Sequence, residues 1–285
     1  MRPGPLDVVL SVVIPLKNEA LNVPPLCEEL TGALLSAAVP YELILVDDGS
    51  TDETFDRLAR VQRLDPRVRV IRFDRNYGQT AAFAAGFAHA RGRFVATLDG
   101  DLQNDPADLP RMLALAQTHD IVCGWRKDRH DAWLTRRVPS MIANWLLGLA
   151  SGLRLHDNGC SVKVFRADIV KPLKLRPGMH RYLPAIAGQL GDRVIEVVVN
   201  HRPRRYGRSK YGLSRTFRVA ADLLHLRALM RSAVDPGTPR LPPYRIAQVL
   251  QHPQAPGDQA DDETPLAAAE TDRGRERGSP GARGR

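Results

Sequence analysis

Two aspartates flank a glycine where an apolar run ends in the segment RFVATLDGDLQNDP, residues 93–106. The run predicts a buried strand, and Asp99 and Asp101 follow it directly. Two carboxylates this close repel each other, and Mg²⁺ or Mn²⁺ between them removes the repulsion, because these ions prefer hard oxygen ligands. Gly100 lets the backbone bend toward one point, and Gln103 adds a further oxygen. We therefore expect a metal site of Asp99, Asp101 and Gln103, although an isolated DGD motif is also typical of an exposed acidic turn.

A second acidic strand end occurs in VDDGSTDET, residues 46–54, where Asp47 and Asp48 close another apolar run. Ligands of open α/β sheets bind at the carboxyl ends of the strands. We therefore expect Asp48 to accept hydrogen bonds from a nucleobase N–H group or a ribose hydroxyl. Capping of the next helix by Ser50, Thr51 or Asp52 is the structural alternative, but a cap needs one such residue and no paired aspartates.

Basic residues gather in RPRRYGRSKYG, residues 202–212, which contains Arg204, Arg205 and Lys210. Clustered arginine and lysine bind phosphate groups, arginine as a bidentate fork and lysine as a point charge. Arg126 adds a further cation at the end of the apolar run 120–125. A solvated basic loop is the alternative for 202–212.

These residues need a scaffold that brings strand ends together. Apolar runs at 10–16, 41–47, 67–73, 93–99 and 120–125 predict strands, and 20–37, 52–64, 79–91 and 107–118 predict the helices between them. This alternation indicates an α/β fold with a mostly parallel central sheet flanked by helices. The later chain predicts strands at 160–166 and 193–201 and helices at 131–155, 179–190 and 214–231.

Composition limits the class of protein. The chain has 285 residues, a hydrophobic content of 43% and a formal net charge of +9, which favours an anionic partner. A nucleic acid partner would leave the acidic strand ends unexplained, so we expect none. Helices 131–155 and 214–231 carry arginines beside apolar residues and suit either a membrane interface or a core or dimer contact. Residues 232–285 contain eight prolines and six glycines, which predicts a disordered tail.

Seven motifs occur in a fixed order along residues 10–231: SVVIPLKNEA, VDDGSTD, LDGDLQNDP, GWRKDR, LHDNGCSVKVFR, GMHRYLPA and RPRRYGRSKYG. Together they resemble family 2 glycosyltransferases, specifically polyprenyl-phosphate sugar transferases of the dolichyl-phosphate mannosyltransferase and undecaprenyl-phosphate glucosyltransferase type. The resemblance implies a GT-A fold with a nucleotide-sugar half at 10–125 and an acceptor half at 126–231. Two features depart from the family: Lys17 replaces an aromatic residue, and the Pro- and Gly-rich tail stands where many relatives continue into transmembrane helices.

The resemblance also implies roles for individual residues. The nucleoside would be held by Pro15, Glu19, Val46 and Asp48. The metal and the diphosphate would be held by Asp99, Asp101 and Gln103, with Arg126 beside the phosphates. The acceptor phosphate would be held by Arg204, Arg205 and Lys210. Asp157 would lie near the reacting sugar, where it either orients hydroxyl groups or acts as a base.

The implied reaction is a metal-dependent, inverting transfer of a hexose from a UDP- or GDP-sugar to undecaprenyl or dolichyl phosphate. We expect no signal peptide and no transmembrane helix, peripheral binding to the cytoplasmic face of the inner membrane, and scope for a homo-oligomer. Two alternatives stay open: a transferase that acts on a saccharide or protein hydroxyl, and a non-catalytic membrane-associated homologue.

Overall fold

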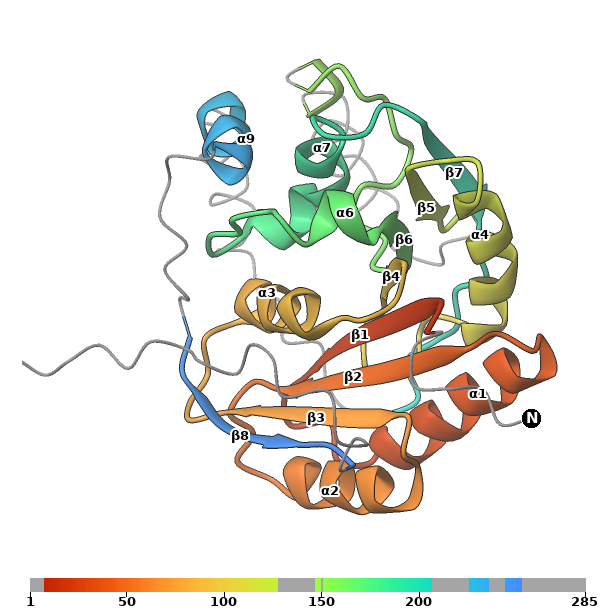
Figure 1. Cartoon of the computed structure of the whole chain (residues 1–285), viewed down its shortest axis with the longest axis vertical. Helices are drawn as coiled ribbons and strands as arrows, with labels where there is room; N and C mark the ends of the chain where they lie inside the picture. Colours follow the sequence, from red (N-terminus) through yellow and green to blue (C-terminus); the bar gives the residue numbers. More distant parts are fainter. Residues whose placement is uncertain (1–7, 128–146, 150, 207–225, 236–243, 253–285) are drawn as a thin grey trace, which may run out of the picture. The chain divides into compact units, whose positions relative to one another are not determined.

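The structure is a computed structural model that describes residues 8–127, 147–149, 151–206, 226–235 and 244–252. Its centre is an eight-stranded sheet with the strand order β7-β5-β6-β4-β1-β2-β3-β8 (Figure 1). The strands are β1 (Leu10–Leu16), β2 (Tyr41–Asp47), β3 (Val68–Phe73), β4 (Phe94–Thr97), β5 (Ile121–Trp125), β6 (Lys163–Arg166), β7 (Val194–Val198) and β8 (Ile246–Leu250).

Most strands of this sheet run in one direction. β1 pairs in parallel with β2 and β4, β2 pairs with β3, and β5 pairs with β7. β6 lies antiparallel between β4 and β5, and β8 lies antiparallel to β3. Among the described strands only β6 and β8 are therefore reversed, which confirms the expected α/β fold with a mostly parallel sheet.

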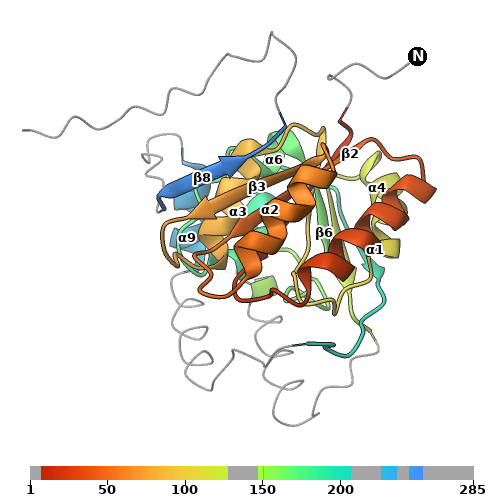
Figure 2. The same cartoon turned by 90° about the horizontal axis from the view of Figure 1, so that it is seen from below.

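Helices cover both faces of the sheet (Figures 1 and 2). One face carries α1 (Val23–Ser36), α2 (Thr54–Leu64) and α4 (Leu109–Ala116), and the other carries α3 (Gln79–His89), α6 (Ala167–Val170) and α7 (Leu183–Ala187). The 3₁₀ turns η1 (Pro106–Asp108) and η3 (Met179–Tyr182) precede α4 and α7. A hydrophobic core lies on each face of the sheet. Along β2, Leu43 and Leu45 belong to the core beneath α1, α2 and α4, whereas Ile44 and Val46 belong to the core beneath α3, α6 and α7, because side chains alternate between the faces of a strand.

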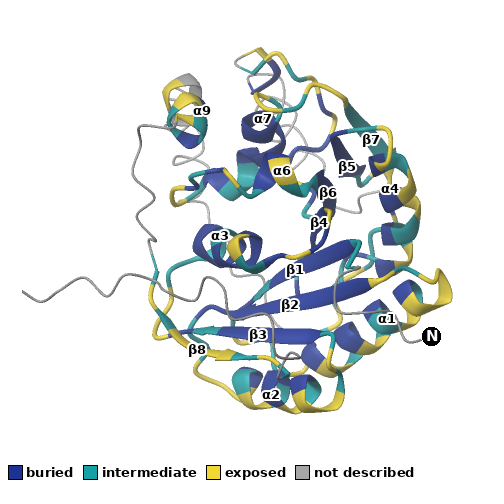
Figure 3. Cartoon of the chain, viewed as in Figure 1, coloured by how far each residue is buried: buried dark blue, intermediate teal, exposed yellow. Residues whose placement is uncertain are grey.

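The central strands follow the sequence closely. β1 and β2 have the bounds expected from their apolar runs, and both are buried along nearly their whole length (Figure 3). β4 is shorter than the expected 93–99, because its pairing with β1 ends where Thr97 faces Val13. The chain leaves the sheet at that point, so Asp99 and Asp101 follow the carboxyl end of β4.

The C-terminal part differs from expectation. The helix expected at 214–231 is described only as α9 (Leu226–Val234), and residues 128–146 of the earlier amphipathic segment lie outside the described ranges. The tail expected from residue 232 is not disordered throughout. β8 pairs with β3 and forms the edge of the sheet, and Tyr244 stacks on Phe73 with ring centroids 4.9 Å apart. In the part of the chain that the structure describes, no helix has the length and hydropathy to cross a bilayer.

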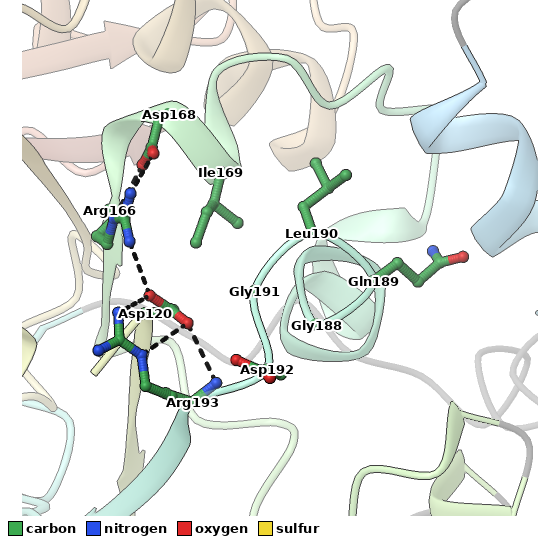
Figure 4. Close-up of a pocket in the computed structure, with 10 residues that line it drawn as sticks. All are labelled: Asp120, Arg166, Asp168, Ile169, Gly188, Gln189, Leu190, Gly191, Asp192 and Arg193. Carbon is green, nitrogen blue, oxygen red and sulfur yellow. Dashed lines mark hydrogen bonds and ion pairs between the residues drawn. The ribbon is translucent and has the colours of Figure 1, made fainter. Parts of the chain in front are cut away.

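Ion pairs connect β5, β6 and β7 at the end of the sheet where β5 and β7 begin. Asp120 precedes β5 and accepts hydrogen bonds from Arg193, which precedes β7, at 2.8 Å, and from Arg166, which ends β6, at 3.0 Å (Figure 4). Arg166 also pairs with Asp168. The Arg193 side chain, together with the other hydrogen bonds, lowers the pKa of Asp120 to about 2. One buried carboxylate thus joins the ends of three neighbouring strands.

Candidate functional site

A cavity of about 560 Å³ opens at the carboxyl ends of the parallel strands. Its walls come from the ends of β1, β2 and β4, from the start of α3, and from the segment around η3. Six of the residues expected from the sequence line this one cavity: Pro15, Glu19, Asp48, Asp99, Asp101 and Arg204. The topology therefore gathers groups that lie up to 189 positions apart, counted from Pro15 to Arg204.

Asp48 organises one end of the cavity. Its carboxylate accepts hydrogen bonds from the backbone N–H groups of Tyr77, at 2.6 Å, and Gly78, at 2.9 Å. Burial raises the pKa of Asp48, and these N–H donors and the charge of Lys17 oppose that shift. Lys17 also donates through Nζ to the carbonyl oxygens of Asp48 and Gly49, at 3.5 and 3.4 Å. Asp48 thus fixes the segment that leads into α3, in addition to facing the cavity.

The other residues expected around a nucleoside take different positions. Pro15 and Val46 are paired neighbours in β1 and β2, but only Pro15 lines the cavity. Val46 is fully buried in the core beneath α3, so its side chain does not take the lining position that we expected. Glu19 lines the cavity, accepts a hydrogen bond from Asn22 Nδ2, and is fixed through its backbone N–H to Thr54 Oγ1 at 2.9 Å.

Asp99 and Asp101 are each held by a polar partner. Gln79 Nε2 donates to Asp99 Oδ1 at 2.7 Å, and Arg204 Nη2 donates to Asp101 Oδ2 at 2.6 Å. Burial raises the pKa of both carboxyl groups, and the charge of Asp101 raises that of Asp99 further. The charge of Asp101 thus disfavours ionisation of Asp99, as the sequence suggests, whereas the charge of Arg204 lowers the pKa of Asp101.

The backbone between these aspartates packs closely against the end of β1. A Cβ atom on Gly100 would lie 2.9 Å from Leu16 Cδ2, so a larger residue there would require the Leu16 side chain to shift. The backbone is left-handed at Leu102, whose φ is 61°. This turn directs the Gln103 N–H to Asp101 Oδ1 at 3.2 Å. Asp105 then accepts from Ala107 N–H and caps η1, as expected.

The donor groups at this turn fit a hard divalent cation. The buried carboxylate of Asp101 and the partly buried carboxylate of Asp99 offer oxygen ligands, and Gln103 Oε1 lies 3.3 Å from Arg204 Nη2. Within the described ranges, no three His, Cys, Asp or Glu residues are grouped as a metal site. Asp99 and Asp101 by themselves supply carboxylate oxygens of the kind through which proteins commonly hold Mg²⁺ or Mn²⁺, with substrate phosphates completing the coordination.

Arg126 and Asp157 form a bidentate ion pair beside this site. Arg126 donates from Nε to Asp157 Oδ2 at 2.7 Å and from Nη2 to Oδ1 at 2.9 Å, and both side chains are largely buried. Glu196 accepts hydrogen bonds from the backbone N–H groups of His156 and Asp157. The charge of Arg126 lowers the pKa of Asp99, which opposes the effect of burial there. Arg126 thus interacts electrostatically with Asp99, one of the expected metal ligands.

The basic loop divides into separate environments. Arg204 binds Asp101, as described above, and lines the cavity. Arg202 donates to Glu29 Oε2 at 2.6 Å and to the carbonyl oxygen of Asn104, so it anchors the loop to α1 and to the acidic turn. Arg205 lies over the Tyr206 ring at 5.6 Å and does not line the cavity. Lys210 lies outside the described residues.

The cavity is also lined by polar residues that sequence reasoning did not assign, among them Gln79, Thr80, His180 and Arg181. Thr80 Oγ1 lies 2.7 Å from His180 Nδ1 and accepts a hydrogen bond from Gly178 N–H at 3.0 Å. The histidines of this chain have no ligand spacing, so nothing local marks His180. The signal available was its place in the motif GMHRYLPA.

Comparisons with known proteins identify the family of the chain. The family model described as glycosyl transferase family 2 matches residues 11–173. A dodecaprenyl-phosphate galacturonate synthase of Rhizobium johnstonii is 48% identical over 233 residues, which is 80% of this chain and 69% of the relative. An undecaprenyl-phosphate 4-deoxy-4-formamido-L-arabinose transferase of Edwardsiella ictaluri is 38% identical over 217 residues, which is 75% of this chain and 66% of the relative.

Solved structures share the fold. Glucosyl-3-phosphoglycerate synthase from Mycobacterium tuberculosis, crystallised with Mn²⁺, UDP and phosphoglyceric acid, superposes with a TM-score of 0.61. The two sequences are 20% identical, and the superposition covers 80% of each chain. At this identity the likeness concerns the fold alone.

Proposed function

Because the chain belongs to glycosyl transferase family 2, we propose that it moves a sugar from a nucleoside diphosphate sugar to a polyprenyl phosphate. The observation that carries this proposal is the single cavity lined by Asp48, Asp99, Asp101 and Arg204. It combines a nucleoside end, a pair of metal-binding carboxylates and a cation from the loop expected to bind the acceptor. The names of both relatives above support a polyprenyl phosphate acceptor.

In the proposed reaction an oxygen of the lipid phosphate bonds to the anomeric carbon, and the bond from that carbon to the diphosphate breaks. A divalent cation held by Asp99, Asp101 and Gln103 would supply neutralisation of the leaving diphosphate. Arg126 would add a second positive charge near the same groups. Arg204, Arg205 and Lys210 would position the acceptor phosphate through charge.

The acceptor makes a protein base unnecessary. A phosphate monoester has a second pKa of about 6, so it is already largely dianionic at neutral pH. Both carboxylate oxygens of Asp157 accept hydrogen bonds from Arg126, which favours a positioning role over that of a base. One displacement without a protein nucleophile inverts the anomeric centre, so an α-linked donor would give a β-linked product.

We further propose that the donor sugar is a uronic acid. The relative named for galacturonate is 48% identical to this chain, whereas the relative named for formamido-arabinose is 38% identical. We also propose that the protein binds the cytoplasmic face of the inner membrane peripherally, where the lipid acceptor is accessible.

The test is a transfer assay with the purified full chain, Mn²⁺, polyprenyl phosphate and radiolabelled UDP-galacturonic acid, UDP-glucose or UDP-N-acetylglucosamine. We expect label from UDP-galacturonic acid to enter the organic phase, and Asp99→Ala to abolish the transfer. Label that stays aqueous with every donor, or that appears on an added saccharide or protein, would contradict the proposal.

A further inference from the structure

Three successive residues at the start of α3 contact three different parts of the cavity. Gly78 N–H binds the Asp48 carboxylate, Gln79 binds Asp99, and Thr80 bonds to His180. A nucleoside diphosphate sugar has the same linear order: nucleoside, diphosphate, sugar. If Asp48 faces the nucleoside and Asp99 the diphosphate, the region by Thr80 and His180 faces the sugar.

The wall of this third region is firmly anchored. Gly178 adopts φ 92° and donates its N–H to Thr80 Oγ1 at 3.0 Å, which ties the segment before η3 to α3. Met179 and Tyr182 are buried in the core, at 2% and 5% exposure. The two residues between them, His180 and Arg181, line the cavity. Because the buried side chains of Met179 and Tyr182 anchor the turn on both sides, His180 and Arg181 are held at the cavity wall next to Thr80.

The cations around the cavity have separate positions. Lys17 lies at the carbonyl oxygens of Asp48 and Gly49, at the nucleoside end. Arg204 binds Asp101 at the diphosphate region, whereas Arg126 binds Asp157 and does not line the cavity. Arg181 is the guanidinium on the sugar wall among the described lining residues.

We infer that Arg181 determines specificity for an acidic donor sugar by pairing with the sugar carboxylate, while Thr80 and His180 position its hydroxyl groups. This inference rests on the function proposed above. A guanidinium matches a carboxylate with two parallel hydrogen bonds, and a neutral hydroxymethyl group at the same carbon offers no such match. Arg181 thereby separates donors that differ only at the sixth carbon.

The experiment compares UDP-galacturonic acid with UDP-galactose, using the full chain and the variants Arg181→Gln, Arg181→Lys and Arg176→Gln. Arg176 is the matched control, because it lies in the same segment, is exposed and does not line the cavity. Calorimetry measures binding of each nucleotide sugar without acceptor. Binding of UDP, which has no sugar, verifies that each variant keeps its nucleotide site.

We expect Arg181→Gln to weaken UDP-galacturonic acid binding about 30-fold, the range for a lost charge-assisted pair, and to change UDP and UDP-galactose binding less than about 3-fold. Arg181→Lys should lose less, and Arg176→Gln should match the wild type. An equal loss for both sugars, or no loss for the acidic one, would overturn the inference. If the wild type prefers UDP-galacturonic acid through Arg181 but glycosylates no lipid, the inference stands and the proposed function fails.

Discussion

Arg204 Nη2 donates a hydrogen bond to Asp101 Oδ2 at 2.6 Å across 103 positions of the sequence. This contact joins the loop expected to bind the acceptor phosphate to a carboxylate expected to bind the metal. If Asp101 binds a divalent ion as proposed, the Arg204 guanidinium and that ion would compete for one carboxylate. Occupation of the donor site would then affect the position of a residue that we expect to bind the acceptor.

Replacement of Arg204 should therefore have opposite effects on the two substrates. In Arg204→Gln we expect Mn²⁺ with UDP to bind as tightly as in the wild type or about 3-fold more tightly, because the competing cation is gone. The KM for polyprenyl phosphate should rise about 10-fold or more. Calorimetry of Mn²⁺–UDP binding and initial rates against the lipid measure the two effects. Weaker metal binding would show that Arg204 supports the metal site and does not compete with it.

The two carboxylates of the acidic turn should be essential for catalysis but not for folding. We expect Asp99→Asn and Asp101→Asn each to lower kcat/KM by about 10³-fold, since each would remove a charged ligand of the cation that neutralises the leaving diphosphate. Asp105→Asn is the control: it changes a carboxylate of the same turn that caps η1, and because asparagine caps about as well as aspartate, it should cost less than about 1 kcal/mol of stability with activity retained. Comparable activity in Asp99→Asn and the wild type would exclude the metal site.

The Arg126–Asp157 pair should behave as one unit. Asp157→Asn leaves a buried guanidinium without its charged partner, which costs about 3–5 kcal/mol of unfolding free energy. Arg126→Lys loses the bidentate geometry and should lower kcat about 10- to 100-fold. A double-mutant cycle in urea denaturation and in kcat measures the coupling. Additive effects would show that the two side chains act independently, contrary to the geometry.

The Asp120 network predicts a pH-dependent stability. Because the folded pKa of Asp120 is lowered to about 2, from an ordinary 3.8, its contribution is complete above pH 4 and is lost as the pH falls from about 4 to 2. Asp120→Asn should lower the Tm by about 2–4 °C at pH 7, with a smaller difference at pH 3. Asp168→Asn, which changes an exposed carboxylate of the same cluster, should change the Tm far less. A difference that grows toward acid pH would contradict this assignment.

The fold was predictable where continuous apolar runs decide it. Residues 10–16 and 41–47 form strands with the expected bounds, because complete burial in a parallel sheet demands such runs. β8 was missed because its five-residue run, IAQVL, lies in a Pro- and Gly-rich tail whose overall composition predicts disorder. Pairing with the edge of β3 gives it order that no local pattern signals.

The candidate site was predictable only where chemistry is local. Asp48, Asp99 and Asp101 are recognisable in the sequence because they directly follow apolar runs that predict strands. Their position in one cavity follows from the parallel topology, which places the carboxyl ends of these strands side by side. The link between Thr80 and His180 spans 100 positions, and the link between Arg204 and Asp101 spans 103. Such contacts depend on how the loops pack, and a single sequence does not encode them in any short pattern. The roles of Arg205 and Lys210 stay predictions.

The identity of the bond that the protein makes is the most direct test of the account. The lipid product of the wild type, formed from UDP-galacturonic acid and polyprenyl phosphate, is isolated, and NMR coupling between phosphorus and the anomeric proton is measured. We predict a direct bond from the anomeric carbon to the lipid phosphate oxygen, with the configuration inverted relative to the donor. A sugar attached elsewhere, or a product that retains the donor's configuration, would contradict it.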